Sequence, residues 1–309
     1  MNTPNPNPST STPAAQPAST PATPAIHAPF LKWAGSKRRL LPQLLVLLPK
    51  GQRLIEPFVG AGSVFMATNY PQYLLADTNS VLMPLYGQLQ MDPQAMLAAS
   101  QALFVQSNRT QEAYNTLRAR FNNPATSEVE RCALFVYLNK FAFNGLFRMN
   151  KKGQMNVPYA HHTRLPGFPE RAMQGFAQKL GNLDAPVELL CAGFEETMAQ
   201  AKPGDVVYCD PPYLPMDHGR ACFTAYGSDG FGLAAHQRLT DLARELAGRG
   251  IPVLISNHDS PTTRDLYAGA TLHSVHAHRS LAASQSARGT VAELVAVFCE
   301  NLQKADVAQ

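Results

Sequence analysis

The sequence lacks several features that would define other classes of protein. Its five cysteines include no CxxC pair, which argues against a disulfide framework and against a cysteine zinc site. No apolar run approaches the length that spans a bilayer, and the N-terminal residues show neither the basic nor the apolar region of a signal peptide. We therefore expect a cytoplasmic protein without membrane association.

Acidic residues are missing from two stretches of the chain, whose formal net charge is +4. Residues 27–53 contain six Lys or Arg and residues 139–164 contain five, and neither stretch contains an acid. Such stretches can form a surface that faces the phosphates of a nucleic acid. An ordinary solvated face has the same composition, so the charge pattern permits a nucleic-acid partner without requiring one.

Composition separates a tail from a globular part. Residues 1–28 are nearly all Asn, Thr, Pro, Ser, Ala and Gln. They offer too few large apolar side chains to offset the entropy of ordering, so we predict a disordered tail. The chain as a whole has 309 residues, 45% of them hydrophobic, which is enough for a sizeable core.

Beyond the tail, apolar runs of strand length alternate with helical patterns. Residues 60–69 are predicted to start a helix, and residues around Leu239, Ala243 and Leu246 to form another. The predicted strands are residues 53–58, 73–76, 187–192, 205–209, 251–256, 271–278 and 293–298. This alternation predicts an α/β fold, a mostly parallel sheet with helices on both faces.

Residues 80–170 differ from the rest because they show helical spacing and little strand signal. Strand signals return only after this segment. We therefore predict a mostly helical inserted domain at 80–170, between the two parts of the chain, 29–79 and 171–309, that build the sheet.

A glycine turn followed by an acid opens the globular part. The strand ending at Phe58 precedes Gly60 and Gly62, which let a backbone approach a ligand closely at the start of a helix. Phe65 replaces the third glycine of the dinucleotide fingerprint, so the turn alone is a weak signal. Asp77, after the next strand, is placed either to accept hydrogen bonds from ribose hydroxyls or to cap the following helix.

The tetrad Asp210-Pro211-Pro212-Tyr213 ends another predicted strand. Its prolines lack N–H donors but keep their carbonyls, so the Asp210 carboxylate and the Pro211 carbonyl make an acceptor-rich site. Such a site favours a pyramidal amino nitrogen whose lone pair can attack an electrophilic methyl group. Tyr213 offers a face for stacking a base that has left the double helix. The alternative is a plain strand-ending turn.

In these motifs and their order the chain resembles the Dam family of DNA adenine N6-methyltransferases. The collinear matches extend over about residues 29–298, and they are residues 30–37, 56–65, 75–79, 144–146, 156–158, 207–213 and 253–259. The resemblance implies a Rossmann-like methyltransferase sheet that uses S-adenosylmethionine, formed by residues 29–79 and 171–309. It also implies that the insertion, 80–170, is a target-recognition domain that binds double-stranded DNA, with GATC as the favoured target.

The resemblance implies roles for individual residues as well. The catalytic residues would be Asp210, Pro211, Pro212 and Tyr213. The cofactor-binding residues would be Trp33, Lys37, Phe58, Gly60, Gly62, Asp77 and Asp210. The DNA-binding residues would be Lys32, Phe143, Asn144, Leu146, Arg148 and Pro158. Neither a metal nor an obligate protein partner is expected.

Physical chemistry agrees with several of the implied DNA contacts. Arg148 can bond a guanine edge bidentately, and Leu146 or Pro158 can pack on a thymine methyl group. Phe143, where relatives often have Tyr, keeps the flat ring needed to fill the space left by an adenine. His161-His162 stands where relatives tend to have Arg and Tyr, and this puts a phosphate or base contact in doubt because histidine is mostly uncharged near neutral pH.

Two other functions remain open on the sequence. A methyltransferase acting on RNA or on a protein glutamine commonly has Asn in place of Asp210 and lacks the insertion. A DNA-binding protein that lost the reaction would not need the intact set of Gly60, Asp77 and 210–213. A metal site at His276 and His278 is not expected, because no acid or cysteine completes a ligand set.

Overall fold

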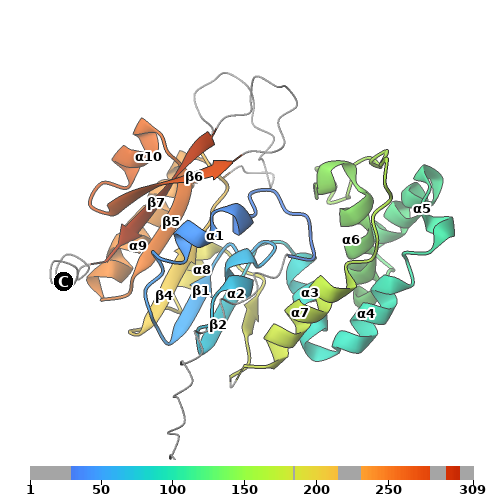
Figure 1. The fold of residues 1–309 in the computed structure, drawn as a ribbon, viewed down its shortest axis with the longest axis horizontal. Coiled ribbons are helices and arrows are strands. Elements are labelled where there is room, and N and C mark those ends of the chain that lie inside the picture. Colours follow the sequence, from blue (N-terminus) through green and yellow to red (C-terminus); the bar gives the residue numbers. More distant parts are fainter. Residues whose placement is uncertain (1–28, 184, 215–230, 279–289, 300–309) are drawn as a thin grey trace, which may run out of the picture.

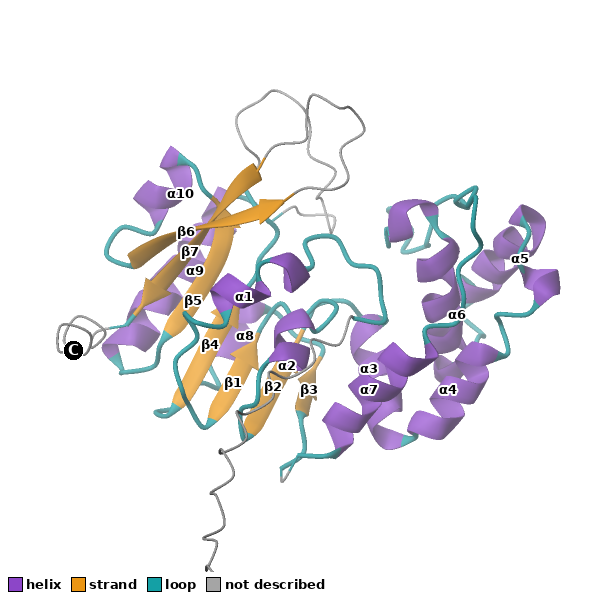
Figure 2. Cartoon of the chain, in the orientation of Figure 1, coloured by secondary structure: helices purple, strands orange, loops and turns teal. Residues whose placement is uncertain are grey.

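A computed structural model describes residues 29–183, 185–214, 231–278 and 290–299. Its centre is a seven-stranded sheet with the strand order β3-β2-β1-β4-β5-β7-β6, which occupies one side of the molecule (Figures 1 and 2). The strands are β1 (Arg53–Glu56), β2 (Gln72–Ala76), β3 (Glu188–Leu190), β4 (Asp205–Cys209), β5 (Val253–His258), β6 (Thr271–His278) and β7 (Thr290–Phe298). The predicted tail, 1–28, lies outside the described residues.

Helices of four to 16 residues connect or cover these strands. They are α1 (Leu41–Leu44), α2 (Ser63–Ala67), α3 (Leu82–Met91), α4 (Pro93–Gln101), α5 (Gln111–Phe121), α6 (Glu128–Phe141), α7 (Glu170–Gly181), α8 (Phe194–Met198), α9 (Leu233–Gly248) and α10 (Pro261–Leu266). Three short 3-10 turns are η1 (Lys37–Arg39), η2 (Gln106–Asn108) and η3 (Phe143–Gly145).

The two faces of the sheet bury two separate sets of side chains. On β4, Val206 and Tyr208 belong to one hydrophobic cluster, whereas Val207 and Cys209 belong to the other, as the two-residue period of a strand requires. The first cluster continues into α1, α2 and the helices between β2 and β3, and the second is covered by α8, α9 and α10. The predicted α/β architecture with helices on both faces is thereby confirmed.

The parallel part of the sheet reverses its direction of growth between β1 and β4. From β1 the chain adds β2 and β3 on one side, and it then returns to add β4 and β5 on the other. A ligand site in an open α/β sheet forms outside the carboxyl ends of the strands at such a switch point. The glycine turn after β1 and the tetrad after β4 both lie there.

Several strand boundaries differ in detail from expectation, and the last strand of the chain lies inside the sheet. The first strand ends at Glu56 rather than Phe58, because Pro57 has no N–H to donate to a ladder. The last predicted strand, 293–298, begins earlier, at Thr290. It does not form the edge of the sheet, since β7 runs antiparallel between β5 and β6.

The segment between β2 and β3 contains α3 to α7 and, among its described residues, contributes no strand to the seven-stranded sheet. Figure 2 shows these helices gathered beside the sheet. Side-chain caps fix several starts: Asp92 accepts from Ala95 N, Thr110 from Ala113 N and Ser127 from Glu130 N. The segment shares its hydrophobic cluster with one face of the sheet, so the two parts pack as one body.

Candidate active site

The glycine turn after β1 is held by polar groups from the next strand and helix. The Gly60 N–H donates to Asp77 Oδ2 over 3.1 Å, and the Tyr86 hydroxyl donates to the Gly60 carbonyl over 2.5 Å. Gly60 and Gly62 have φ values of 47° and 68°, a left-handed conformation that favours glycine. The turn is therefore a fixed structure directly beside Asp77.

Packing is a second reason for glycine at both positions. A Cβ atom on Gly60 would lie 2.8 Å from Trp33 Nε1, and one on Gly62 would lie 2.7 Å from the Phe176 ring. The ring of Trp33 thus lies directly on the turn. The structure brings together three of the predicted cofactor residues, Trp33, Gly60 and Asp77.

Asp77 does not cap the following helix. Its Oδ1 accepts from Asn79 N over 2.9 Å, and it is Asn79 that accepts from the N–H groups of Val81 and Leu82 at the start of α3. Burial raises the pKa of the Asp77 carboxyl group, while the bonds from Asn79 and Gly60 oppose that rise. The capping alternative therefore belongs to Asn79, and Asp77 faces the turn.

Asp210 is paired with a buried lysine from the N-terminal segment. Lys37 Nζ lies 2.6 Å from Asp210 Oδ1 and donates to the Gly35 carbonyl over 2.8 Å, with only 5% of its side chain exposed. Burial raises the pKa of Asp210 to about 6, and the Lys37 ammonium limits this rise. The predicted catalytic and cofactor residues Asp210 and Lys37 therefore form one ion pair.

The ring of Tyr213 is held in place from three sides. Its hydroxyl donates to Glu293 Oε2 of β7 over 2.6 Å. The imidazole of His258 packs edge-on against the ring at 4.8 Å, and Lys37 Nζ lies 4.6 Å from its centre. The sequence offered no motif for Glu293, because its role depends on β7 pairing with β5 eighty residues after the tetrad.

The backbone of the tetrad is held by a histidine of α9. His236 Nε2 lies 3.0 Å from the Pro212 carbonyl, and its Nδ1 lies 3.5 Å from Asn257 Nδ2. Burial lowers the pKa of His236 to about 4, so the ring is neutral near pH 7 and donates its Nε2 proton to the carbonyl. This bond fixes the Pro212 carbonyl and with it the backbone of the tetrad.

Asn257, which contacts His236, connects the end of β5 to the same loop. Its Oδ1 accepts from Leu214 N over 3.2 Å and its Nδ2 donates to the Tyr267 hydroxyl over 2.9 Å. His236 and Asn257 are both fully buried, at 0% exposure. A polar residue on the apolar face of a helix, such as His236 three positions before Leu239, is the signal that would have indicated this role.

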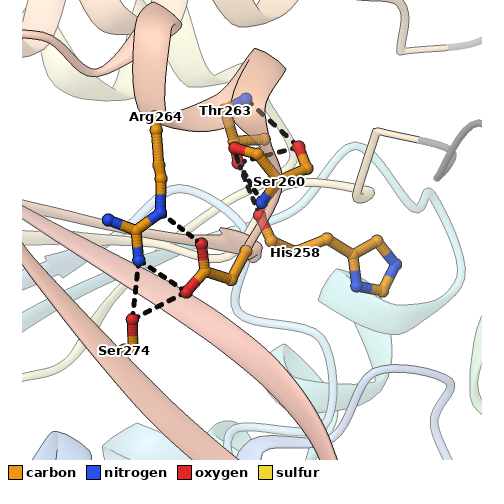
Figure 3. A network of polar contacts seen from close by, with 6 residues as sticks. His258, Ser260, Thr263, Arg264 and Ser274 are labelled. Atoms are coloured by element: carbon orange, nitrogen blue, oxygen red, sulfur yellow. Dashed lines mark hydrogen bonds and ion pairs between the residues drawn. The ribbon is translucent and has the colours of Figure 1, made fainter.

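A separate polar network fixes the chain after β5 (Figure 3). Arg264 of α10 makes two hydrogen bonds to the Asp259 carboxylate and one to Ser274 of β6. Ser260 caps α10 through Thr263. In Figure 3 the His258 ring points away from this network, and its contact is with Tyr213 instead. The network thus supports the site without being part of it.

Aromatic rings gather from the residues after β1, the start of α8 and the residues before α9. Phe58 stacks on Phe194 with 5.8 Å between ring centroids, and Phe231 contacts both rings at 5.6 Å. Phe231 also packs edge-on against His236 at 4.7 Å. Phe58 and Phe231 are only partly buried, so the cluster offers a flat apolar surface at the carboxyl end of the sheet.

The end of β1 also carries a buried carboxyl group. Burial raises the pKa of Glu56 to about 8, and the Lys179 ammonium partly opposes this. Its Oε1 has no hydrogen-bond partner among the described residues. A buried polar atom without a partner is uncommon, so Glu56 Oε1 is an acceptor available to a bound polar group.

Five of the predicted DNA-contact residues lie on two segments of the insertion, 143–148 and 156–158, and the sixth, Lys32, is an exposed residue of the N-terminal segment. Phe143 is 52% exposed, and Asn144 adopts the left-handed φ of 54°. Arg148 Nε donates to Asn156 Oδ1 over 2.9 Å, and the Phe143 N–H donates to the Pro158 carbonyl over 2.9 Å. Backbone bonds therefore fix these segments, while the side chains stay at the surface.

The two histidines that depart from the expected pattern follow directly. His161 is exposed and His162 is partly buried. Burial and the nearby Lys32 ammonium lower the pKa of His162, so it is uncharged at neutral pH.

Two further expectations concern metals and membranes. Within 29–183, 185–214, 231–278 and 290–299, no three His, Cys, Asp or Glu side chains are grouped as metal ligands; the side chain of His278 lies outside the described set. Among the helices that the structure describes, none is long and apolar enough to cross a membrane.

A mostly parallel sheet with the glycine turn, Asp77 and the tetrad 210–213 at its switch point is the arrangement of a Rossmann-like methyltransferase. Residues 33–281 match the family described as D12 class N6 adenine-specific DNA methyltransferase. The chain is 43% identical to a DNA adenine methylase of Vibrio cholerae over 274 residues, or 88% of this chain and 96% of that protein. It is 42% identical to the DNA adenine methylase of Escherichia coli K12 over 269 residues, or 87% and 94%.

The chain therefore belongs to the D12 class of N6 adenine-specific DNA methyltransferases. The resemblance to the Dam family, inferred from its motifs, is confirmed. An enzyme of this class acts on DNA adenine, which removes the alternatives of RNA or protein substrates.

Proposed function

We propose that the protein transfers a methyl group from S-adenosylmethionine to N6 of an adenine that has flipped out of duplex DNA, within the sequence GATC. The observation that carries this proposal is the position of the Asp210 carboxylate. It lies beyond β4 at the switch point of the sheet, next to the glycine turn and Asp77 beyond β1 and β2. Donor and acceptor of the methyl group can meet there.

The residues at the turn fit S-adenosylmethionine. Asp77 provides a carboxylate for the ribose hydroxyls, the rings of Phe58 and Phe231 provide an apolar surface for adenine, and Glu56 Oε1 is a buried acceptor for the ammonium group. Trp33 covers the turn at Gly60. When bound, the cofactor supplies a methyl group made electrophilic by its sulfonium, and the transfer needs no metal.

The tetrad prepares the target amino group. Asp210 and the Pro211 carbonyl accept its two hydrogens, which draws the N6 lone pair out of conjugation with the ring. The lone pair would then form the new N–C bond to the methyl group that the cofactor supplies, and the N6 proton hydrogen-bonded to Asp210 would pass to solvent. Lys37 pairs with one carboxylate oxygen of Asp210 and so holds the carboxylate in place for the amino group.

The insertion reads the DNA. Arg148 contacts a guanine edge, Leu146 and Pro158 contact thymine methyl groups, and Asn144 and Lys32 contact neighbouring positions. The exposed ring of Phe143 enters the stack where the adenine leaves. Residues 80–170 thus act as the target-recognition domain, and 29–79 with 171–309 as the catalytic domain. The protein works on double-stranded DNA in the cytoplasm.

Transfer of a labelled methyl group to plasmid DNA tests the proposal. We expect label in N6-methyladenine only when the plasmid contains GATC. Digestion with nucleases that differ in their sensitivity to GATC methylation then locates the product. Label in a GATC-free plasmid would disprove the target sequence, and the absence of label from any DNA would disprove the reaction.

A further inference from the structure

A buried asparagine in α6 joins two segments of the chain. One is residues 143–148, which we call the recognition segment, and the other is the N-terminal segment before η1. Asn139 Oδ1 accepts from Lys32 N over 2.8 Å, and its Nδ2 donates to the carbonyls of Lys32 over 2.7 Å and Gly145 over 3.1 Å. The Asn139 side chain is 1% exposed. All of its bonds are to backbone, so it fixes the course of both segments regardless of their side chains.

The two segments touch at this point. Gly145 has a φ of 65°, and a Cβ atom there would lie 2.5 Å from the Cβ of Lys32. Gly145 stands between Asn144 and Leu146, two of the proposed DNA contacts. A displacement of this part of η3 therefore moves Lys32.

The N-terminal segment continues from Lys32 to the other sites. We call residues 32–37 the bridging segment. Trp33 packs on Gly60 of the glycine turn and edge-on against Phe135 of α6. Ser36 Oγ lies 2.9 Å from Ser63 Oγ at the start of α2, and Lys37 pairs with Asp210. The blue loop before α1 in Figure 1 shows this segment between the sheet and the insertion.

We infer that Asn139 is a positioning residue that couples DNA recognition to cofactor binding through the bridging segment; this rests on the proposed function. DNA that shifts η3 shifts Lys32 through the shared Asn139 amide, and Trp33 moves with it on the glycine turn. Such coupling is reciprocal, so the cofactor must strengthen DNA binding by the factor by which DNA strengthens cofactor binding. Asn139 itself contacts neither ligand in this scheme.

Calorimetry on the full chain tests the coupling. The affinity for S-adenosylhomocysteine, which cannot donate a methyl group, is measured alone and with a saturating GATC duplex. We expect the duplex to tighten binding at least about fivefold, the low end of typical coupling. In Asn139→Ala the ratio should fall to less than about twofold, while affinity without DNA should stay close to the original value.

Asn122 provides a matched control. Its side chain also bonds backbone in both directions, accepting from Met155 N over 2.8 Å and donating to Met155 O over 3.0 Å. Both partners lie within the insertion, so Asn122→Ala perturbs the recognition fold without touching the bridging segment. We expect this variant to keep the coupling ratio even where its affinity for DNA falls.

Asn139→Asp keeps the acceptor for Lys32 N but loses both N–H donors. If Asn139→Ala does not fold, this second variant tests whether Asn139 carries the coupling. An unchanged ratio in the folded Asn139 variants, or a ratio of one in the original protein, would overturn the coupling while leaving the methyl-transfer reaction intact. Failure to bind S-adenosylhomocysteine or the duplex at all would instead reject the proposed function. Equal loss of coupling in Asn122→Ala would make Asn139 an ordinary structural residue.

Discussion

The tetrad, 210–213, and the proposed recognition segment, 143–148, hold their residues in opposite ways. At the tetrad, partners from other elements fix two side chains and one backbone carbonyl: Lys37 pairs with Asp210, Glu293 accepts from Tyr213, and His236 donates to the Pro212 carbonyl. At the recognition segment backbone bonds fix the chain while Phe143 and Arg148 remain exposed.

The difference follows from the two tasks. A group that stabilises a transition state gains most when it is oriented before the substrate arrives, because no reorganisation then opposes the reaction. A group that reads a base edge must reach its partner across a surface. We expect substitutions at the tetrad to lower the rate, and substitutions at the recognition segment to change which sequence is methylated.

The largest effect should come from Asp210→Ala. Loss of this transition-state acceptor should lower kcat by about two to three orders of magnitude, with the fold retained. Single-turnover methyl transfer measures the rate. Asp259→Ala is the matched control, since Asp259 pairs with Arg264 outside the site. Near-original turnover of Asp210→Ala would show that the tetrad does not set the rate of methyl transfer.

Asp77→Ala should weaken S-adenosylmethionine binding by about 1.5–3 kcal/mol, as loss of hydrogen bonds to a charged group does. Calorimetry measures the change, and the affinity for DNA should stay nearly constant. Asp92→Ala serves as the control, because the Asp92 carboxylate caps α4 by accepting from Ala95 N. Unchanged cofactor affinity in Asp77→Ala would reduce Asp77 to a support of the turn.

Arg148→Ala should lower activity on GATC more than on sites altered at the guanine that it reads, by about 1–3 kcal/mol. Its bond to Asn156 orients the guanidinium and uses one of five donors. Duplexes with each single substitution in GATC provide the comparison. Lys151→Ala and Lys152→Ala should weaken binding equally on all sequences and flatten its salt dependence. If Arg148→Ala does the same, Arg148 contacts phosphate.

The smallest effect concerns the pH profile. Asp210 must be ionised to accept from the amino group, so kcat/KM should fall as pH drops through about 6, the pKa of Asp210. Lys37 lowers this pKa and Glu293 raises it. Lys37→Met should therefore move the acidic limb to higher pH, and Glu293→Gln to lower pH. Shifts in the same direction would show that another group controls the limb.

The sequence predicted what lies in contiguous motifs. The tetrad, the glycine turn and Asp77 could be found because each follows a strand, and parallel strands bring their carboxyl ends to one edge. Glu293, His236 and Asn139 escaped because each acts on backbone or side chains more than twenty residues away. An alternating pattern predicts a strand but not the strand with which it pairs. The position of β7 inside the sheet could therefore not be predicted.

Because β7 both separates β5 from β6 and carries Glu293, the enzyme cannot mature in the order in which it is synthesised. While the ribosome is still making residues after β6, β5 has an open edge and Tyr213 lacks the acceptor for its hydroxyl. Competence for catalysis therefore comes late in biosynthesis, when residues 290–298 insert between strands that have already emerged.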